Sequence, residues 1–303
     1  MINAYIGVTD NQWFSLLKSQ PDTDEVNFWS PSGKFFKALK PGELFLFKLH
    51  YPENFVVGGG IFAHSTVLPI SLAWEAFGIK NGASSLTDLR EKIDKYRKIP
   101  GDPYEDYQIG CILIQQPFFL PENKWILPPD DMPKNIVSGK RYDLSVEPGL
   151  SIWNQLKIAR SQKNVIQEPA VRYGKPTIVL PRLGQGSFRI LVTDAYERKC
   201  AISSERTLPV LEAAHIKPYS ASGEHKVNNG ILFRQDIHTL FDRGYLTVTP
   251  DLKVEVSRKI REEFENGKEY YKFHGQLLKT PKSWMDQPSP EYLAWHNDNV
   301  YRG

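Results

Sequence analysis

The sequence predicts an α+β protein with two folded domains joined by a linker. The chain has 303 residues, about twice the length of a typical domain, so it can form two separate cores. Residues 1–130 alternate β-prone runs with amphipathic helical patterns, and residues 177–303 contain helical and β-prone patterns of their own. Between them the composition shifts to residues that support little core. We therefore expect one domain in each of these ranges and a linker over residues 131–176.

The amino-terminal part begins with a strand and a helix. A β-prone run at residues 4–9 precedes Asp10, a favourable helix N-cap, and Trp13, Leu16 and Leu17 then follow at helical spacing. Three more strand candidates and one charged amphipathic helix come next, the strands at residues 43–49, 54–62 and 106–120 and the helix at residues 85–98. This order predicts a small, strongly twisted sheet or barrel with peripheral helices.

The expected linker has an unusual composition. From about residue 128 to residue 176 the chain is enriched in Pro, Gly, Asn, Lys and Ser, starting with "PPDDMPKN". Such a composition forms extended or irregular segments more readily than a core. One helix is still expected inside it, at residues 149–162.

The overall composition leaves the partner open. A net charge of +3 and a pI near 8.6 neither require nor exclude nucleic acid. No run of 18 apolar residues occurs and the start "MINAYIGVTDNQW" lacks a basic segment followed by an apolar one, so we expect a cytoplasmic protein without a membrane partner. Cys111 and Cys200 lie far apart in the sequence and are expected to be free thiols.

Three of the seven histidines lie in one stretch, "LEAAHIKPYSASGEHKVNNGILFRQDIHTLFDRG". After a helix that begins near residue 184, the pattern predicts four elements: a strand at residues 207–218, a loop at 219–230, a helix at 231–242 and a hairpin at 244–257. His215 is then on a strand and His238 on the helix that follows. His225 falls in the glycine-containing loop, where a solvated side chain is expected.

Several quoted segments occur in the order typical of a known nuclease family. "RLGQGSFR", "AYERKCAIS", "LEAAHIKP" and "NNGILFRQDIHTLFDRG" together resemble an HNH endonuclease domain of the ββα-metal fold, over about residues 182–257. The resemblance implies that His215 is the general base that activates water, that Asn229 holds the loop against the strand, and that His238 is a metal ligand. It also implies a DNA substrate and one divalent cation.

The sequence departs from this family at two points. Ala214 stands where the family often has an acidic or histidine metal ligand; Asp242 lies one helical turn after His238 and could share the cation with it, or could instead cap the turn. Such a site suits Mg²⁺ or Mn²⁺. The paired cysteine motifs of many relatives are missing, since "CAIS" keeps one cysteine and "RQDI" none, so no structural zinc is expected.

Three cations near the histidines are candidate phosphate contacts. Lys217, Arg234 and Arg243 have the charge for this role, although each also fits a solvated surface position.

Aromatic residues are dense in the amino-terminal part. Trp13 and Phe77 are expected in the core, whereas Trp29 precedes a Ser-Pro-Ser-Gly turn and is a candidate for an open pocket together with Phe28 and Trp74. The alternative places Trp29 and Trp74 in the core as well.

The same part of the chain resembles the PUA-like superfamily, which includes EVE, YTH and SRA modules. The resemblance rests on "AYIGVTDNQW", "VNFWSPSG", "LKPGELFLFKL" and "NFVVGGGIF" in that order. It implies a small β-barrel that takes a modified base out of its strand and stacks it between aromatic side chains. Residues 1–130 would then recognise modified bases in duplex DNA.

Together these features predict a metal-dependent DNA endonuclease that restricts foreign DNA carrying modified bases. Two alternatives stay open: an HNH nuclease that recognises an unmodified sequence or a structured nucleic acid, and a nucleic-acid-binding protein with a decayed nuclease domain. A homodimer is a further expectation, and cleavage of one strand or both depends on it.

Overall fold

The computed structural model describes residues 3–21, 23–97, 102, 105–161 and 183–303. The chain divides into two compact units, Met1–Pro181 and Arg182–Gly303, each with its own core, and each is described by itself. The α+β class predicted from the sequence is confirmed in both units.

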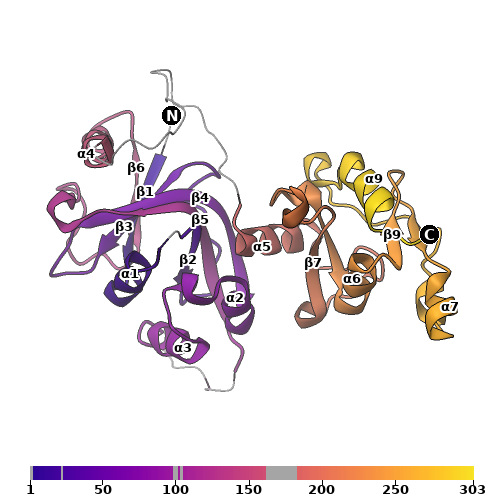
Figure 1. Ribbon diagram of the computed structural model, residues 1–303. Coiled ribbons are helices and arrows are strands. Elements are labelled where there is room, and N and C mark those ends of the chain that lie inside the picture. The colour runs from indigo at the N-terminus through magenta and orange to yellow at the C-terminus, as the bar shows by residue number, and fades with distance from the viewer. Residues whose placement is uncertain (1–2, 22, 98–101, 103–104, 162–182) are drawn as a thin grey trace. The chain divides into compact units, whose positions relative to one another are not determined.

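The first unit is built on one six-stranded sheet with the order β2-β5-β4-β3-β1-β6 (Figure 1). All neighbouring strands are antiparallel except β1 and β3, which are parallel. The strands are β1 (Asn3–Thr9), β2 (Glu25–Ser30), β3 (Leu44–Leu49), β4 (Val56–Pro69), β5 (Gln108–Phe119) and β6 (Gly139–Asp143). The helices are α1 (Asn11–Lys18), α2 (Ile70–Phe77), α3 (Leu86–Asp94) and α4 (Gly149–Ser161).

The sheet curves but does not close. β4 and β5 are long and visibly bent, and their register shifts twice, between Gly59 and Ile61 and between Phe62 and His64 (Figure 1). At Gly59 a Cβ atom would lie 2.6 Å from the carbonyl oxygen of Phe45, so a residue without a side chain is needed there.

The element order allowed a sheet or a barrel, and the structure has the sheet; the small barrel that the PUA-like resemblance implied is not closed in the described residues. In the described residues β2 pairs only with β5 and β6 only with β1, which leaves two sheet edges. The bend arises from the register shifts in β4 and β5, and it does not require that the edge strands bond to each other. The PUA-like assignment stays a prediction.

The predicted N-cap of the first helix is confirmed. The Asp10 carboxylate accepts hydrogen bonds from the backbone N–H groups of Gln12 and Trp13, at 2.9 and 3.0 Å, and so caps α1. Trp13 and Phe77 are buried, as predicted.

The segment predicted as a linker contains ordered structure up to residue 161. Strand β6 pairs with β1, and Tyr142 from β6 and Ile152 and Leu156 from α4 join a core that contains Ile6 and Leu46. A five-residue edge strand gives little sequence signal among Pro and Gly residues, which explains why composition alone indicated a linker. The rest of the segment, residues 162–176, lies outside the described residues.

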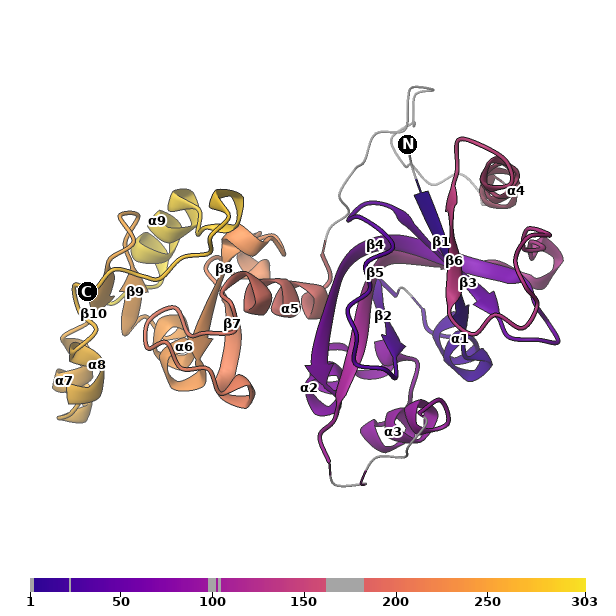
Figure 2. The ribbon, with the colours of Figure 1, turned by 180° about the vertical axis from the view of Figure 1, so that it is seen from behind.

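The second unit combines two small hairpin sheets with helices (Figure 2). β7 pairs with β8 and β9 pairs with β10, both antiparallel. The strands are β7 (Leu211–His215), β8 (Gly230–Arg234), β9 (Leu246–Val248) and β10 (Val254–Val256). The helices are α5 (Gln185–Ala195), α6 (Gln235–Asp242), α7 (Lys259–Phe264), α8 (Lys268–Tyr271) and α9 (Pro290–Asn299).

One predicted helix of this unit begins with residues that form a strand. Residues 231–242 were expected to be helical throughout, but Ile231, Leu232 and Phe233 belong to β8, and α6 starts only at Gln235. A short continuous apolar run is compatible with a buried strand or a buried helix. These three residues form a strand because they pair with β7 and all three side chains are completely buried.

Both cysteines are buried, and neither forms a disulfide. In the described part of the chain, no helix combines the length and the apolar character that crossing a membrane requires.

Candidate functional site

His215 is the last residue of β7 and is held by an aromatic ring from α5. Phe188 stacks on the imidazole with a ring-centroid distance of 3.8 Å and an interplanar angle of 11°. Opposite His215 in the sheet stands Gly230, where a Cβ atom would approach Val192 of α5 to 2.4 Å. The glycine thus lets α5 pack closely against the hairpin, which brings Phe188 onto His215.

His225 is the hydrogen-bond partner of His215. The Nε2 atom of His215 and the Nδ1 atom of His225 are 2.9 Å apart, and Tyr219 stacks on His225 at a centroid distance of 5.1 Å. The expectation of a solvated His225 was therefore wrong, because the loop folds back onto the end of β7. Sequence reasoning missed this residue. The one signal that could have indicated it is its position ten residues after His215, within one strand-loop-strand unit.

The surroundings of His215 favour its neutral form. Burial lowers its pKa to about 4, and nearby His225 and His238 add to this effect, while Asp242 opposes it. At neutral pH the imidazole is therefore uncharged and able to accept a proton.

Asn229 joins the loop to the strand end. Its side chain is fully buried; Oδ1 accepts from the backbone N–H of Lys217, and Nδ2 donates to the carbonyl oxygens of Lys217 and Glu224, all at 2.9 Å. The residue after Glu224 is His225, so these bonds fix the backbone next to both histidines of the pair. Asn229 is a positioning residue in this arrangement.

His238, on α6, lies between two carboxylates. Its Nδ1 atom is 2.7 Å from Oε2 of Glu212 on β7, and its Nε2 atom is 3.3 Å from Oδ2 of Asp242 one helical turn later. The structure thus brings together the predicted pair of His238 and Asp242. It adds Glu212, which the sequence did not indicate as functional; the one available signal was an acidic residue in the otherwise apolar strand that ends at His215.

The two carboxylates also control the charge of His238. Burial alone would lower its pKa, but the hydrogen bonds to Asp242 and Glu212 outweigh burial and raise the pKa above its usual value. His215 and His238 are thus shifted in opposite directions within one site.

The donor set around His238 is small. In the described residues no group of three or more His, Cys, Asp or Glu side chains could hold a metal ion. Two donors are nevertheless suitably placed for an open site, namely Nε2 of His238 and the Asp242 carboxylate, which is 58% exposed. Glu212 on Nδ1 would leave Nε2 unprotonated and aimed at a cation, which is how carboxylates commonly orient ligating histidines.

The three candidate phosphate contacts differ in availability. Both Nε and Nη2 of Arg234 donate to the Asp236 carboxylate, at 2.6 and 2.7 Å, so this guanidinium is already occupied. The Nζ atom of Lys217 lies over the ring of Trp295, 5.6 Å from its centroid. Arg243 is exposed just after α6.

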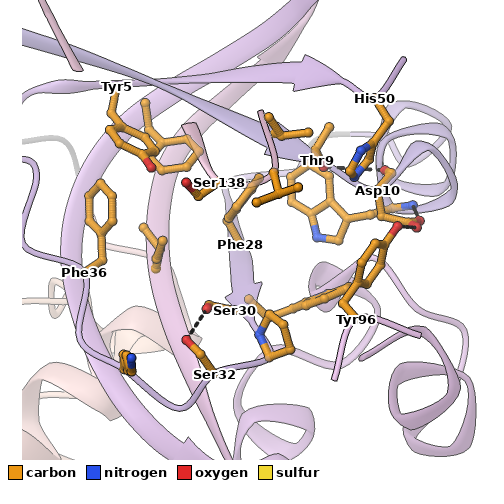
Figure 3. A pocket seen from close by; sticks show the side chains of 18 of the residues that line it. Tyr5, Thr9, Asp10, Phe28, Ser30, Ser32, Phe36, His50, Tyr96 and Ser138 are labelled. Atoms are coloured by element: carbon orange, nitrogen blue, oxygen red, sulfur yellow. Dashed lines mark hydrogen bonds between the residues drawn. The ribbon is translucent and has the colours of Figure 1, made fainter. Parts of the chain in front are cut away.

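The first unit contains a separate cavity of about 680 Å³ (Figure 3). Phe28 and Trp29 line it, as expected for a pocket, whereas Trp74 on α2 is not among its lining residues. In Figure 3, Tyr5 and Phe36 lie on one side of the cavity and Asp10, His50 and Tyr96 on the other. The cavity therefore combines aromatic walls with a polar end at Asp10, His50 and Tyr96, and Ser30, Ser32, Lys34 and Ser138 add further polar groups to its lining.

Hydrogen bonds and stacking order the polar end of the cavity. Tyr96 donates its hydroxyl to Oδ2 of Asp10 at 2.7 Å, and His50 stacks on Tyr96 with an interplanar angle of 6°. Burial lowers the pKa of His50. Trp29 is only 8% exposed, and its Nε1 donates to the carbonyl oxygen of Asn81 at 3.0 Å. Burial and this hydrogen bond thus hold the Trp29 ring in place at one wall of the cavity.

One known family matches part of the second unit. Residues 200–249 match the family model described as HNH endonuclease. The chain contains an HNH endonuclease domain. The matched range includes His215, Asn229 and His238, together with Glu212 and Asp242. The nuclease assignment made from the ordered sequence segments is therefore confirmed.

One solved structure similar to this chain is named "Modification dependent TagI restriction endonuclease". The two chains share 12% sequence identity over 97% of this chain and 81% of the other, with a TM-score of 0.28. A search of curated proteins found no match.

The opposite pKa shifts predict the titration of the two histidines. In the metal-free protein, His215 is expected to stay neutral down to about pH 4, because its protonated form is disfavoured, whereas His238 is expected to stay protonated above pH 6.5. Histidine NMR signals recorded against pH, and assigned with His215→Gln and His238→Gln, measure both midpoints. Equal midpoints near 6.5 would show that the environment does not separate them.

Proposed function

We propose that the protein is a metal-dependent DNA endonuclease directed to duplexes that carry modified bases, and that His215 is its general base. The observation that carries the nuclease mechanism is the pairing of a neutral, stacked His215 with a carboxylate-bound His238 inside the HNH match. Two titratable groups of one type with opposite shifts are a common sign of divided acid–base roles.

His215 would remove the proton from the attacking water. The donor of the hydrogen bond between Nε2 of His215 and Nδ1 of His225 depends on the tautomer. In the tautomer with the proton on Nε2 of His215, the Nδ1 atom of His215 keeps the lone pair that would accept the proton from water. Phe188 fixes the plane of the ring and Tyr219 fixes that of its partner. The stacking therefore limits rotation of the base during the reaction.

His238 and Asp242 would hold the divalent cation, with Glu212 orienting the His238 ring. A bound Mg²⁺ or Mn²⁺ would stabilise negative charge on the phosphate and on the leaving oxygen. With two protein donors, most coordination positions are left for water and phosphate oxygens, as is usual for these ions. Lys217 and Arg243 are the better candidates for contacts to neighbouring phosphates, because Arg234 is paired with Asp236.

The cavity of the first unit is proposed to bind the modified base. Its walls are aromatic, and its polar end, with Asp10, His50 and Tyr96, can bond to the edge of a planar neutral ring. Extruding a base costs a few kcal/mol, and each aromatic contact returns about 1 to 3 kcal/mol. Recognition of an unmodified sequence is the main alternative. The homodimer and the cytoplasmic location stay predictions.

The general-base assignment predicts a large loss of rate without loss of DNA binding. His215→Ala is expected to slow cleavage by about 10² to 10⁴, because proton removal from water is lost, while the affinity for duplex DNA stays close to that of the wild type. Single-turnover cleavage and gel-shift titration measure the two effects. A chelator should abolish wild-type cleavage, and a folded His215→Ala protein that cuts at the normal rate contradicts the assignment.

The cavity predicts discrimination between modified and plain duplexes. Trp29→Ala is a poor probe, because truncating this buried tryptophan would cost about 3 to 5 kcal/mol of stability. His50→Ala is better suited: it removes a half-buried ring that lines the cavity and should reduce any preference for a modified duplex about tenfold.

The matched control for this test is His64→Ala, a half-buried histidine on β4 that does not line the cavity. Affinities are measured on methylated, hydroxymethylated, glucosylated and phosphorothioate duplexes against plain DNA of the same sequence. Equal wild-type affinity across this panel would exclude the modified-base proposal and leave the nuclease assignment intact.

A further inference from the structure

Two large apolar side chains of the second unit are left in solvent. Trp284 is 80% exposed and Met285 is 65% exposed, next to each other in the 3₁₀ turn η6 (Trp284–Asp286). Tryptophan is mostly buried in folded proteins, and adjacent exposed Trp and Met residues are typical of binding surfaces. Nothing in the catalytic arrangement described above uses this turn.

The turn lies beside the loop between β7 and β8, residues 216–229. η6 is next to η5 (Val227–Asn229), the turn that ends with the positioning residue Asn229. The backbone N–H of Ser289, shortly after η6, donates to the carbonyl oxygen of Asn228 at 2.9 Å. This backbone bond links the segment that follows the exposed pair to the loop that positions His215 and His225.

Two lysines near this turn can contact phosphates, while the turn itself ends at Asp286. Lys279 and Lys282 precede it in the chain. Lys279 contacts the hydroxyl of Ser204, and the ion pair of Lys282 with Glu197 is at the surface, with 87% of the lysine side chain exposed. Such a surface ion pair is weak, so phosphates can compete for the lysine.

We propose that Trp284 and Met285 contact the bases of the bound DNA next to the cleavage site and hold the duplex in position for His215. The inference rests on the nuclease function of this unit, since it extends the same DNA surface outward from the loop between β7 and β8. An indole can stack on, or insert between, bases of any sequence, so this contact would add affinity and positioning without adding sequence specificity. DNA is preferred over a second protein copy because the turn adjoins the loop that positions His215, where the scissile phosphate has to lie, and because Lys279 and Lys282 precede the pair.

Steady-state cleavage by the full chain tests the proposal on a duplex that the wild type cuts. Trp284→Ala is expected to raise KM about tenfold with little change in kcat, because the contact is present before and during the reaction. Trp284→Phe keeps an aromatic face and should stay within about threefold of the wild type. Leu277→Ala is the matched control, because Leu277 is an equally exposed apolar residue of the same unit, at 69%.

Photo-crosslinking gives a second measurement that does not depend on cleavage. Duplexes that contain 5-iodouracil at successive positions are irradiated with the full-length protein in chelator, and a crosslink on the peptide with Trp284 and Met285 is expected. Unchanged KM in Trp284→Ala with no such crosslink overturns the proposal. So does a DNA-independent change of oligomeric state in Trp284→Ala, which would assign the pair to a protein interface. A failed modified-base proposal would change which duplex is cut but not the ratio between these variants.

Discussion

The candidate nuclease site depends on one buried amide. Asn229 satisfies the backbone of Lys217 and Glu224 with three hydrogen bonds and has no exposed surface. Without it, buried N–H and C=O groups would lose their partners, at about 1 to 3 kcal/mol for each unsatisfied group. The loop between β7 and β8 would then lose the hydrogen bonds that hold His225 against His215. The geometry of the proposed general base, His215, is thus set by a residue that need not touch substrate.

The two histidines of the site differ in the groups that they contact and therefore in their favoured charge. His215 faces an aromatic ring and another imidazole, which favour the neutral form, whereas His238 contacts two carboxylates, which favour the charged form or a bound cation. His215 comes from β7 and His238 from α6. The short hairpin and the helix that follows it therefore supply both the neutral histidine and the carboxylate-bound one. The proposed DNA contact by Trp284 extends from the same loop, so positioning of substrate and of base share one scaffold.

The sequence predicted what depends on local signals. The Asp10 cap, most strands of the first sheet and the placement of His215 and His238 follow from residues close together in the chain. Glu212 was missed because it meets His238 across 26 residues, and this contact exists only after β8 pairs with β7. The same pairing converted residues 231–233 from expected helix to strand. The element order could not decide between a sheet and a barrel, because closure depends on whether two edge strands meet, and no local pattern encodes that.

The most direct test of this account is the replacement Asn229→Asp, which keeps the shape of the side chain but places a carboxylate against the carbonyl oxygens of Lys217 and Glu224. Single-turnover cleavage is measured at a temperature at which circular dichroism shows the variant folded, and the histidine NMR signals are recorded on the same sample. We predict a fall in cleavage rate of about a hundredfold or more, together with loss of the hydrogen bond between His215 and His225. A folded variant that cuts at the wild-type rate would contradict the account.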